Sequence, residues 1–478
     1  YKASLYMLYL LLIKEDNMFR KSVLFLSCAV LLSACCSSGD GYRIKDGVIV
    51  FDEPAPAKGQ EDMLLFAADP IDTVRTGFIG LGMRGPDAVR RFTYIDGAKV
   101  VALCDLEADR VAKSQEILAG RGKPAAAEYS GEDGWKQLCE RDDIDLVYIC
   151  TNWQTHVEMA VYAMECGKHV AVEVPAAMSV AECWRLVDTS ERTRKHCMML
   201  ENCVYDFFEL TCLNMAQQGL FGEVLHAEGA YIHNLEPFWD YYHDNWRLDF
   251  NQKHSGDVYA THGFGPDCQV LNIHRGDKLE YLVSMDTKSV VGLEVAKEKM
   301  GVDTFANGDQ TSTLVKTRNG KTVLIQHNVY TPRPYDRMYQ LVGTKGFADK
   351  YPNSAFAFEP DQIADAAAEY DNLSSHSYVP REVRDSLMAK YKHPIAKEIE
   401  EKAREVGGHG GMDFIMDYRL IWCLRNGKPL DMDVYDAAEW SCLGELTAAS
   451  IANGSKPVKI PDFTRGRWNK VDGLKLAE

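Results

Sequence analysis

From Thr73 to Glu201 the sequence alternates between short apolar runs and amphipathic stretches, and this alternation restricts the chain to few folds. We expect strands at Thr73–Ile79, Lys99–Cys104, Asp145–Cys150, His169–Glu173 and Met198–Glu201. We expect helices at Gly85–Phe92, Glu107–Leu118, Val157–Cys166 and Val180–Thr193. Strands that alternate with helices predict a parallel sheet covered on both faces. The fold class is therefore α/β, with a Rossmann-type parallel-sheet domain over residues 71–201.

A glycine-rich turn, Gly80-Leu81-Gly82-Met83-Arg84-Gly85, joins the first strand to the first helix. Gly80 suits the tight turn, Gly82 lets a pyrophosphate approach the backbone, and Gly85 allows close packing of the helix on the strand. The helix N-terminus adds unpaired N–H groups and a partial positive charge for phosphates. Asp105 ends the second strand, where a carboxylate can bind the ribose 2′-hydroxyl and disfavours NADP. The turn predicts an NAD site; a Rossmann-like fold without a nucleotide is the alternative.

A second polar segment, Thr151 to His156, follows the strand Asp145–Cys150. Ligands of open α/β sheets bind outside the carboxyl ends of the strands, so this segment is a candidate for ligand contacts. The alternative is that His156 simply begins the next helix and touches no ligand.

After Glu201 the pattern changes to a helix at Asp206–Gln218 and then to longer β-like segments. These segments are Val224–Ile232, Leu279–Val291, Thr311–Thr317, Val323–Tyr330 and Met338–Gly343. They predict an open, largely antiparallel sheet in a C-terminal α/β domain, residues 202–478. The run Gly407–Gly411 predicts a flexible turn or a loop of close approach. Helices at Met412–Arg425 and Val434–Ala452 are expected to pack back on the body.

The N-terminus has the pattern of a targeting segment. Met18 to Lys21 gives a basic start, and Val23 to Leu32 is an apolar run too short to span a bilayer. It ends in Leu32-Ser33-Ala34-Cys35, which resembles a bacterial lipobox with Cys35 as the lipidated residue. We therefore expect residues 1–35 to be a leader and residues 36–70 a linker. The protein would be exported and held on a membrane surface by its lipid; a chance cysteine after an apolar run is the alternative.

Charge and cysteine spacing exclude other classes. The formal net charge is −17, and such an acidic surface repels phosphate backbones, so nucleic acid is not an expected partner. The cysteines form no Cys-x-x-Cys pair, so no zinc ribbon or other metal site is predicted. Several of them, such as Cys104, Cys150 and Cys166, lie in apolar periodic segments, which predicts buried free thiols.

Together, Gly80–Gly85, Thr151–His156 and Glu173-Val174-Pro175 resemble the superfamily of glucose–fructose oxidoreductase and inositol dehydrogenase. Many members have a lysine that helps catalysis where this chain has Val174. The Asp-x-x-x-His pair of the dehydrogenases is also absent, since Asp257 precedes His262 by five positions instead of four. These departures argue against ordinary dehydrogenation of a sugar alcohol.

The rest of the chain resembles one branch of that superfamily, glycoside hydrolase family 109, the NAD-dependent α-N-acetylgalactosaminidases. The matching strings are Glu201–Glu209, Asn245–Leu248, Tyr259–Pro266, Asn272–Asp277 and Thr331–Tyr335. The resemblance runs from about Thr73 to the C-terminus and rests on long, unusual strings.

The resemblance implies two sets of site residues. NAD contacts are expected, beyond the glycines, at Met83, Arg84, Asp105, Trp153, Gln154, Thr155, His156, Glu173, Val174 and Asn202. Substrate contacts are expected at Tyr231, Arg247, Tyr259, Ala260, Thr261, His262 and Tyr335. Each has an alternative. Tyr231 and Tyr335 could be half-buried sheet aromatics, and Arg247 could pair with Asp249 or Asp244 on the surface. His262 could be a core histidine, but its place among glycines in a polar, loop-like stretch favours this alternative less than for most histidines.

The chemistry that the resemblance implies is redox-neutral. The sugar is oxidised at C3, loses its C2 proton, eliminates the C1 substituent, adds water and is reduced again. His262, with Tyr259, is the candidate for acid/base work at C1, since imidazole titrates near neutral pH. Two alternatives stay open, a sugar oxidoreductase that passes hydride to a second substrate and a non-catalytic glycan-binding lipoprotein. The expected partner is a glycan; a homo-oligomer stays open.

Overall fold

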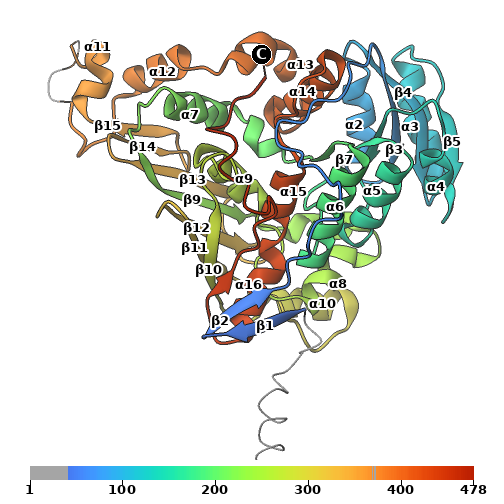
Figure 1. The fold of residues 1–478 in the computed structure, drawn as a ribbon, viewed down its shortest axis with the longest axis horizontal. Coiled ribbons are helices and arrows are strands. Elements are labelled where there is room, and N and C mark those ends of the chain that lie inside the picture. Colours follow the sequence, from blue (N-terminus) through green and yellow to red (C-terminus); the bar gives the residue numbers. More distant parts are fainter. Residues whose placement is uncertain (1–40, 369, 371–372, 478) are drawn as a thin grey trace, which may run out of the picture.

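Two sheets form the body of the protein, one parallel and one mostly antiparallel (Figure 1). The computed structural model describes residues 41–368, 370 and 373–477. The expected leader, with the lipidation residue Cys35, lies outside these described residues. Within them, no helix combines the length and the apolar character that crossing a bilayer requires.

The parallel sheet has six strands in the order β5-β4-β3-β6-β7-β8. In that order the strands are Ala127–Ser130, Ala98–Asp105, Val74–Ile79, Leu146–Ile149, His169–Val172 and Cys197–Met199. Its helices are α2 (Gly85–Phe92), α3 (Ala108–Gly120), α4 (Gly134–Cys139), α5 (His156–Glu165) and α6 (Val180–Thr193). All five strand pairings are parallel, which confirms the predicted Rossmann-type sheet.

The strand order fixes where this sheet can bind a ligand. From β3 the chain moves outward to β4 and β5, then returns to the other side of β3 for β6, β7 and β8. The connections thus reverse direction between β3 and β6, and a crevice forms beside such a switch point at the carboxyl ends of the strands. β6, β7 and β8 are buried at every position, because helices cover both faces of the sheet.

The second sheet has ten strands in the order β1-β2-β16-β10-β11-β12-β9-β13-β14-β15. In that order the strands are Tyr42–Lys45, Val48–Phe51, Val458–Lys459, Leu279–Asp286, Thr311–Thr317, Thr322–Asn328, Val224–Ile232, Asp336–Gly343, Gly346–Asp349 and Ala355–Phe358. Only β9 with β12 and β2 with β16 run parallel, so the prediction of a largely antiparallel sheet is confirmed.

More helices follow the parallel-sheet domain, and the sequence pattern did not reveal all of them. They are α7 (Phe207–Gln217), α8 (Trp246–Lys253), α9 (Thr261–Val270), α10 (Val291–Met300), α11 (Ala364–Ala367), α12 (Arg381–Lys390), α13 (Pro394–Val406), α14 (Met412–Asn426), α15 (Val434–Ser441) and α16 (Leu443–Ala452). The prediction of one helix over Val434–Ala452 is wrong, because the helix is interrupted at Cys442 and continues as a second helix. α15 packs on β8 and α16 on β10, so this pair joins the two sheets (Figure 1).

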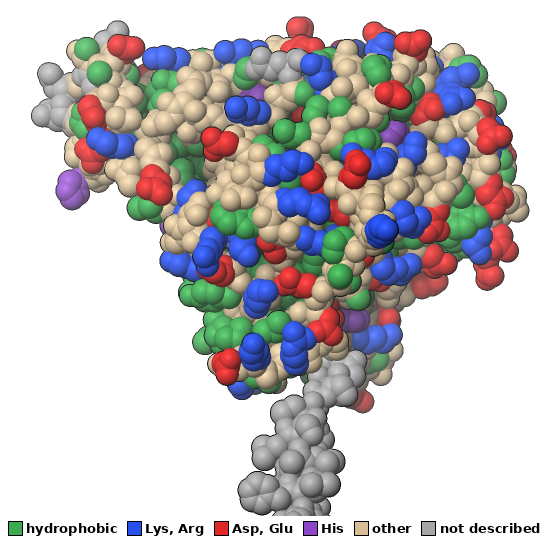
Figure 2. Space-filling view, in the orientation of Figure 1, with side chains coloured by type: hydrophobic (Ala, Val, Ile, Leu, Met, Phe, Trp, Pro, Cys, Tyr) green, Lys and Arg blue, Asp and Glu red, His purple; other side chains and the backbone are tan. Residues whose placement is uncertain are grey.

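The segment expected to be a linker is part of the body from residue 41 onward. β1 and β2 form a hairpin on the edge of the second sheet, where Ile49 and Phe51 are buried. Further along, Asp62 pairs with Lys470 at 2.8 Å, and the backbone N–H of the buried Met63 donates a hydrogen bond to the Tyr435 hydroxyl at 3.0 Å. Figure 2 shows lysine and arginine side chains gathered among acidic ones on this face. Strand pairing and ion pairs therefore hold residues 42–63 against the fold.

The eleven cysteines among the described residues are free, as predicted, and nine of them are buried. Of the three named from the sequence, Cys104 is buried, whereas Cys150 and Cys166 are only half-buried. Burial raises the pKa of the Cys104 thiol to about 12, so this side chain is a neutral core residue.

Candidate functional site

The glycine turn after β3 has the shape that a dinucleotide requires. Gly80 has a φ of +91°, and a Cβ there would lie 2.6 Å from the carbonyl group of Cys150. A Cβ on Gly85 would lie 2.0 Å from the carbonyl oxygen of Gly80. On Gly82 the nearest atom would be an Arg110 nitrogen at 3.7 Å. Packing therefore requires glycine at the two ends of the turn, while Gly82 leaves open space beside the backbone, which fits a bound pyrophosphate.

Asp105 ties the end of β4 to this turn. Its carboxylate accepts hydrogen bonds from the backbone N–H of Leu81 at 2.6 Å and of Glu107 at 3.0 Å. Arg110 lies 3.3 Å from the same carboxylate. The predicted ribose-binding carboxylate thus stands beside the glycine turn, at the edge of the sheet where the ribose is expected.

Arg84 connects this turn to the far side of the site. Its Nε donates to Glu173 at 3.2 Å, and its Nη2 donates to Asp413 at 3.2 Å. Burial opposes a charged guanidinium, yet these two carboxylates raise the pKa of Arg84. Asp413 also accepts from the side-chain amide of Asn202 at 2.5 Å. Two residues expected at NAD, Arg84 and Asn202, are therefore linked through Asp413, which sequence analysis did not single out.

The other residues expected at NAD surround this network. Met83 is exposed on the turn, and Val174 is buried beside Glu173. Trp153 begins a one-turn helix that precedes α5. In this turn Gln154 is exposed and Thr155 is half-buried. These side chains all follow carboxyl ends of β3, β6 and β7, where the topology places a ligand.

His156 has a structural role in this arrangement. Its Nδ1 lies 2.8 Å from the carbonyl oxygen of Pro175, and its Nε2 lies 3.1 Å from that of Thr151. Burial lowers the pKa of His156, while its contacts with the two carbonyls act in the opposite direction. Through these contacts the ring joins the loops after β6 and β7. Since both nitrogens contact protein oxygens, the geometry favours the alternative in which this ring touches no ligand.

A carboxylate, an imidazole and a phenol form the candidate acid/base group. Glu201 accepts from His262 Nδ1 at 2.7 Å, and His262 Nε2 lies 3.3 Å from the Tyr259 hydroxyl. Burial opposes ionisation of Glu201, but His262 and nearby donors outweigh it and lower the pKa of this carboxyl. Burial raises the pKa of Tyr259, so its hydroxyl keeps the proton that it can donate to Nε2. The carboxylate thereby selects one orientation and one tautomer of the imidazole.

The prediction that His262 lies in a polar loop is wrong, because it stands in the first turn of the buried helix α9. The neighbouring glycines serve close packing. A Cβ on Gly263 would lie 2.2 Å from the backbone nitrogen of Ala230 in β9, and one on Gly265 would meet Trp440 at 2.9 Å. Ala260 and Thr261, both buried, begin this helix beside His262. The glycines therefore bring α9 against the second sheet and place His262 beside the end of β8.

Arg247 is buried, which argues against the alternative of a surface ion pair; the carboxylate of Asp249 instead accepts from Lys253. The guanidinium donates through Nη1 to the Tyr242 hydroxyl at 2.7 Å. It lies 4.5 Å from the ring centre of Tyr259 and 5.0 Å from that of Trp153. Its Nε and Nη2 have no hydrogen-bond partner within the described residues. A buried cation with two unused donors is suited to a ligand oxygen.

Tyr231 and Tyr335 are connected by a histidine. Tyr231, buried in β9, has its hydroxyl 3.0 Å from His233 Nδ1, and the His233 ring packs edge-on against the exposed Tyr335 with centres 5.0 Å apart. Burial and the nearby Arg247 lower the pKa of His233 to about 4, so its ring is neutral. Tyr231 also packs edge-on against Tyr259 at 4.7 Å. The structure thus brings together the side chains expected at the substrate.

Several site residues escaped sequence analysis as individual candidates. Glu201 lies just after β8, and His233 follows β9. Their positions at the ends of strands could have marked them as candidates for ligand contacts. His409, in the glycine loop before α14, has its Nδ1 2.9 Å from Asp413. Of the two readings for Gly407–Gly411, the loop of close approach fits, since a Cβ on Gly408 would lie 2.7 Å from the side chain of Asp413.

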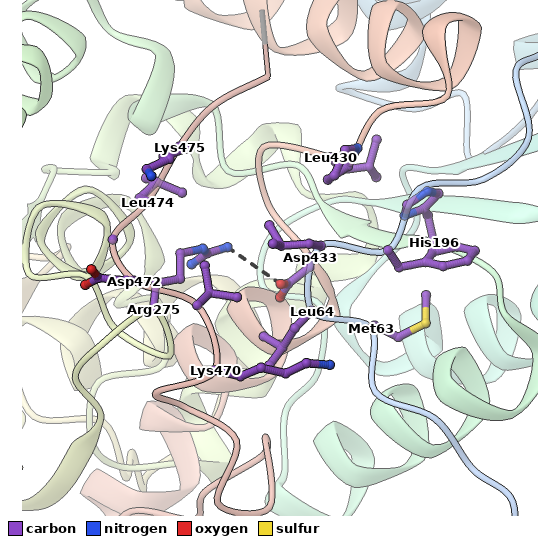
Figure 3. Close-up of a pocket in the computed structure, with 15 residues that line it drawn as sticks. Met63, Leu64, His196, Arg275, Leu430, Asp433, Lys470, Asp472, Leu474 and Lys475 are labelled. Atoms are coloured by element: carbon purple, nitrogen blue, oxygen red, sulfur yellow. Dashed lines mark ion pairs between the residues drawn. The ribbon is translucent and has the colours of Figure 1, made fainter.

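One cavity of the molecule stands apart from this site. A cavity of about 310 Å³ opens between the N-terminal and C-terminal segments, with Arg275 and Asp433 in its wall (Figure 3). It shares no residue with the predicted site. Among the described residues, two groups have donor atoms spaced for a metal ion: Glu201, Cys203 and His262, and His274, Asp433 and Asp436. In each group an arginine already contacts one donor, Arg337 at 3.0 Å from Cys203 Sγ and Arg275 at 2.7 Å from Asp436.

Comparison with known proteins agrees with both halves of this geometry. A family model described as the oxidoreductase family, NAD-binding Rossmann fold, matches residues 74–201. A model of the glycosyl hydrolase 109 C-terminal domain matches residues 205–470.

Similar proteins cover nearly the whole chain. A glycosyl hydrolase family 109 protein 1 of Bacteroides fragilis is 62% identical over 462 residues, which are 95% of this chain and 98% of that protein. A glycosyl hydrolase family 109 protein of Porphyromonas gingivalis is 64% identical over 433 residues, 90% of this chain and 92% of that protein.

Solved structures share the fold at low sequence identity. A levoglucosan dehydrogenase in complex with NADH and L-sorbose has a TM-score of 0.62 and 16% identity, covering 82% of this chain and all of that one. A probable dehydrogenase of Thermotoga maritima has a TM-score of 0.56 and 19% identity, covering 81% of this chain and 99% of that one.

Proposed function

Because the chain belongs to glycosyl hydrolase family 109 and carries an NAD-binding Rossmann domain, we propose that it releases terminal α-linked N-acetylgalactosamine from glycans. The proposed route is oxidation, elimination, addition of water and reduction, with no net use of NAD. The observation that carries the proposal is the Glu201–His262–Tyr259 group, which lies at the carboxyl end of the Rossmann sheet beside the cofactor residues.

The cofactor residues fit a dinucleotide that stays bound. NAD supplies the acceptor and the donor of one hydride. Gly82 leaves room for the pyrophosphate, Arg84 offers a cation at the start of α2, and Asp105 offers an acceptor for the ribose. The buried Val174 occupies the position where related dehydrogenases have a lysine, so this chain has no amine there for proton transfer.

His262 and Tyr259 are the proposed proton-transfer pair at C1. Glu201 holds Nδ1 of the ring, which directs Nε2 toward the Tyr259 hydroxyl. A proton can then pass between phenol, imidazole and the departing oxygen, and the ionised Glu201 stabilises the imidazolium that results. His409, whose Nδ1 faces Asp413, is a second imidazole with a carboxylate partner. The route needs a base at C2 as well as an acid at C1, so two imidazoles can divide these tasks.

Arg247 is the proposed contact to the sugar. Its two unused donors lie among the rings of Trp153, Tyr231 and Tyr259, which give flat apolar surfaces for a pyranose. A sugar oxygen that accepts from this guanidinium would complete the hydrogen bonds of a buried charge.

The proposed route is tested by the fate of the C2 hydrogen. Turnover in D₂O should release N-acetylgalactosamine with deuterium at C2 and protium at C3, because the C2 proton exchanges with solvent and the hydride does not. Mass spectrometry would show one additional non-exchangeable mass unit, and proton NMR would locate it. Full protium at C2 would refute the route even if hydrolysis were fast.

The same preparation separates the alternatives. A net sugar oxidoreductase would accumulate NADH when sugar is added, whereas the proposed enzyme would show constant absorbance at 340 nm after its first turnover. A non-catalytic glycan-binding protein would release no sugar from a panel of nitrophenyl glycosides with NAD⁺ present.

We also propose that the protein is exported and anchored on a membrane surface through Cys35, as the lipobox-like Leu32–Cys35 predicts. An enzyme that regenerates its own NAD⁺ needs no external pool of cofactor, which suits a site outside the cytoplasm.

A further inference from the structure

Asp413 occupies an unusual position in the first turn of α14. Its side chain is only 1% exposed, yet it contacts polar groups from three separate parts of the chain. Oδ1 accepts from Asn202, and Oδ2 accepts from Arg84 and from Nδ1 of His409. Arg91 lies 3.6 Å from Oδ2. One carboxylate therefore joins two residues expected at the cofactor to the imidazole of the glycine loop.

The glycine loop is built for this contact. All five residues from Gly407 to Gly411 have positive φ, including His409 at 45°, a conformation that is costly for a residue with a side chain. A Cβ at Gly408 would collide with Asp413, and one at Gly411 would lie 3.0 Å from the backbone of Ala403. This close approach of the loop to α14 accompanies the contact between Nδ1 of His409 and Asp413.

A second carboxylate on the same helix has a different environment. Asp417, one turn later, accepts from Arg91 at 2.6 Å and from the Tyr148 hydroxyl at 2.8 Å. Among the described residues it makes no hydrogen bond or ion pair with the glycine loop or with Arg84, and both of its partners are buried in the Rossmann core. Asp417 thus fixes α14 to that domain, and it offers a matched comparison for Asp413.

We propose that Asp413 is a positioning residue, which holds the imidazole of His409 beside the residues that bind the cofactor. The catalytic value of this positioning rests on the proposed function above, whereas the contacts of Asp413 do not depend on that function. Two groups face Nδ1 of His409: the Asp413 carboxylate at 2.9 Å and the Nη1 of Arg84, which can only donate, at 3.4 Å. Because the carboxylate is the closer one, it keeps the proton on Nδ1 and leaves Nε2 free. The His409 side chain is 53% exposed, so Nε2 is accessible to substrate or solvent. Because Asp413 also accepts from Arg84, the imidazole and a residue expected at the cofactor share one carboxylate.

The first test measures the tautomer of His409 in the wild-type protein. With ¹⁵N-labelled histidine, the His409 ring signals are assigned by their absence in His409→Gln. The proposal expects a proton on Nδ1 and an unprotonated Nε2 at pH 8. A proton on Nε2 would overturn it. This measurement needs neither activity nor a variant of Asp413 that folds.

The second test compares Asp413→Asn with Asp417→Asn. Asp413→Asn should move the His409 signals toward the other tautomer and lower kcat by about tenfold to a hundredfold, the range for a lost hydrogen bond to a charged group, with KM within about twofold. Asp417→Asn should lower the melting temperature and leave the His409 signals in place. Unchanged signals in Asp413→Asn, or equal movement in both variants, would overturn the proposal. If the wild type releases no sugar while its His409 tautomer is as expected, the proposed function fails and the positioning role of Asp413 stands.

Discussion

Two glycines of the same turn should respond to alanine in opposite ways. At Gly85 a methyl group would lie 2.0 Å from the carbonyl oxygen of Gly80, well inside van der Waals contact. α2 would have to move away from β3, and overpacking of this kind costs about 1–3 kcal/mol. For a domain of this size Gly85→Ala should therefore lower the melting temperature by roughly 2–12 °C. At Gly82 the nearest atom would be 3.7 Å away, so Gly82→Ala should melt within about 1 °C of the wild type.

The affinity for NAD should fall in Gly82→Ala, the variant whose melting temperature is expected to stay unchanged. The methyl group of Gly82→Ala would occupy the space beside the backbone that the pyrophosphate needs, and affinity should fall about tenfold to a hundredfold, as for loss of one hydrogen bond to a charged group. Differential scanning calorimetry without cofactor gives the melting temperatures, and NADH fluorescence gives the affinities. Wild-type affinity in Gly82→Ala, or a melting temperature lowered as much as in Gly85→Ala, would refute the assignment of this turn to the cofactor.

Three further predictions concern other parts of the chain. Asp105→Ala should weaken NAD binding by about 1–3 kcal/mol in a fluorescence titration, and unchanged affinity would remove Asp105 from the site. Burial raises the pKa of Asp257 to about 7, so between its ordinary value of 3.8 and pH 7 the folded state keeps a proton that the unfolded state has lost. Stability should therefore fall as pH rises through this range, and Asp257→Asn should flatten the decline in urea unfolding curves; an unaltered slope would argue against it. Cys35→Ser should leave an uncleaved or soluble protein, and normal membrane fractionation of this variant would count against the lipobox.

The N-terminal segment shows why composition misled the domain assignment. Residues rich in proline, glycine and acids are typical of linkers, and only Val48–Phe51 looked like a strand. That strand pairs with β16, which lies more than 400 residues away in the chain, and Asp62 pairs with Lys470. Neither partner can be recognised from the segment itself, so a docked segment and a free linker have the same local pattern.

The sequence by itself determined the Rossmann domain and its cofactor turn, because these depend on local rules. The alternation of strands and helices is periodic, and the roles of Gly80, Gly85 and Asp105 follow from their spacing within one strand–turn–helix unit. Only the tertiary structure decided how the acid/base groups meet. Glu201 reaches His262 across 61 positions, and Asp413 reaches Arg84 across 329. Such pairs are set by how helices α9 and α14 dock on the sheets, and that docking depends on buried surfaces that no single segment of the sequence contains.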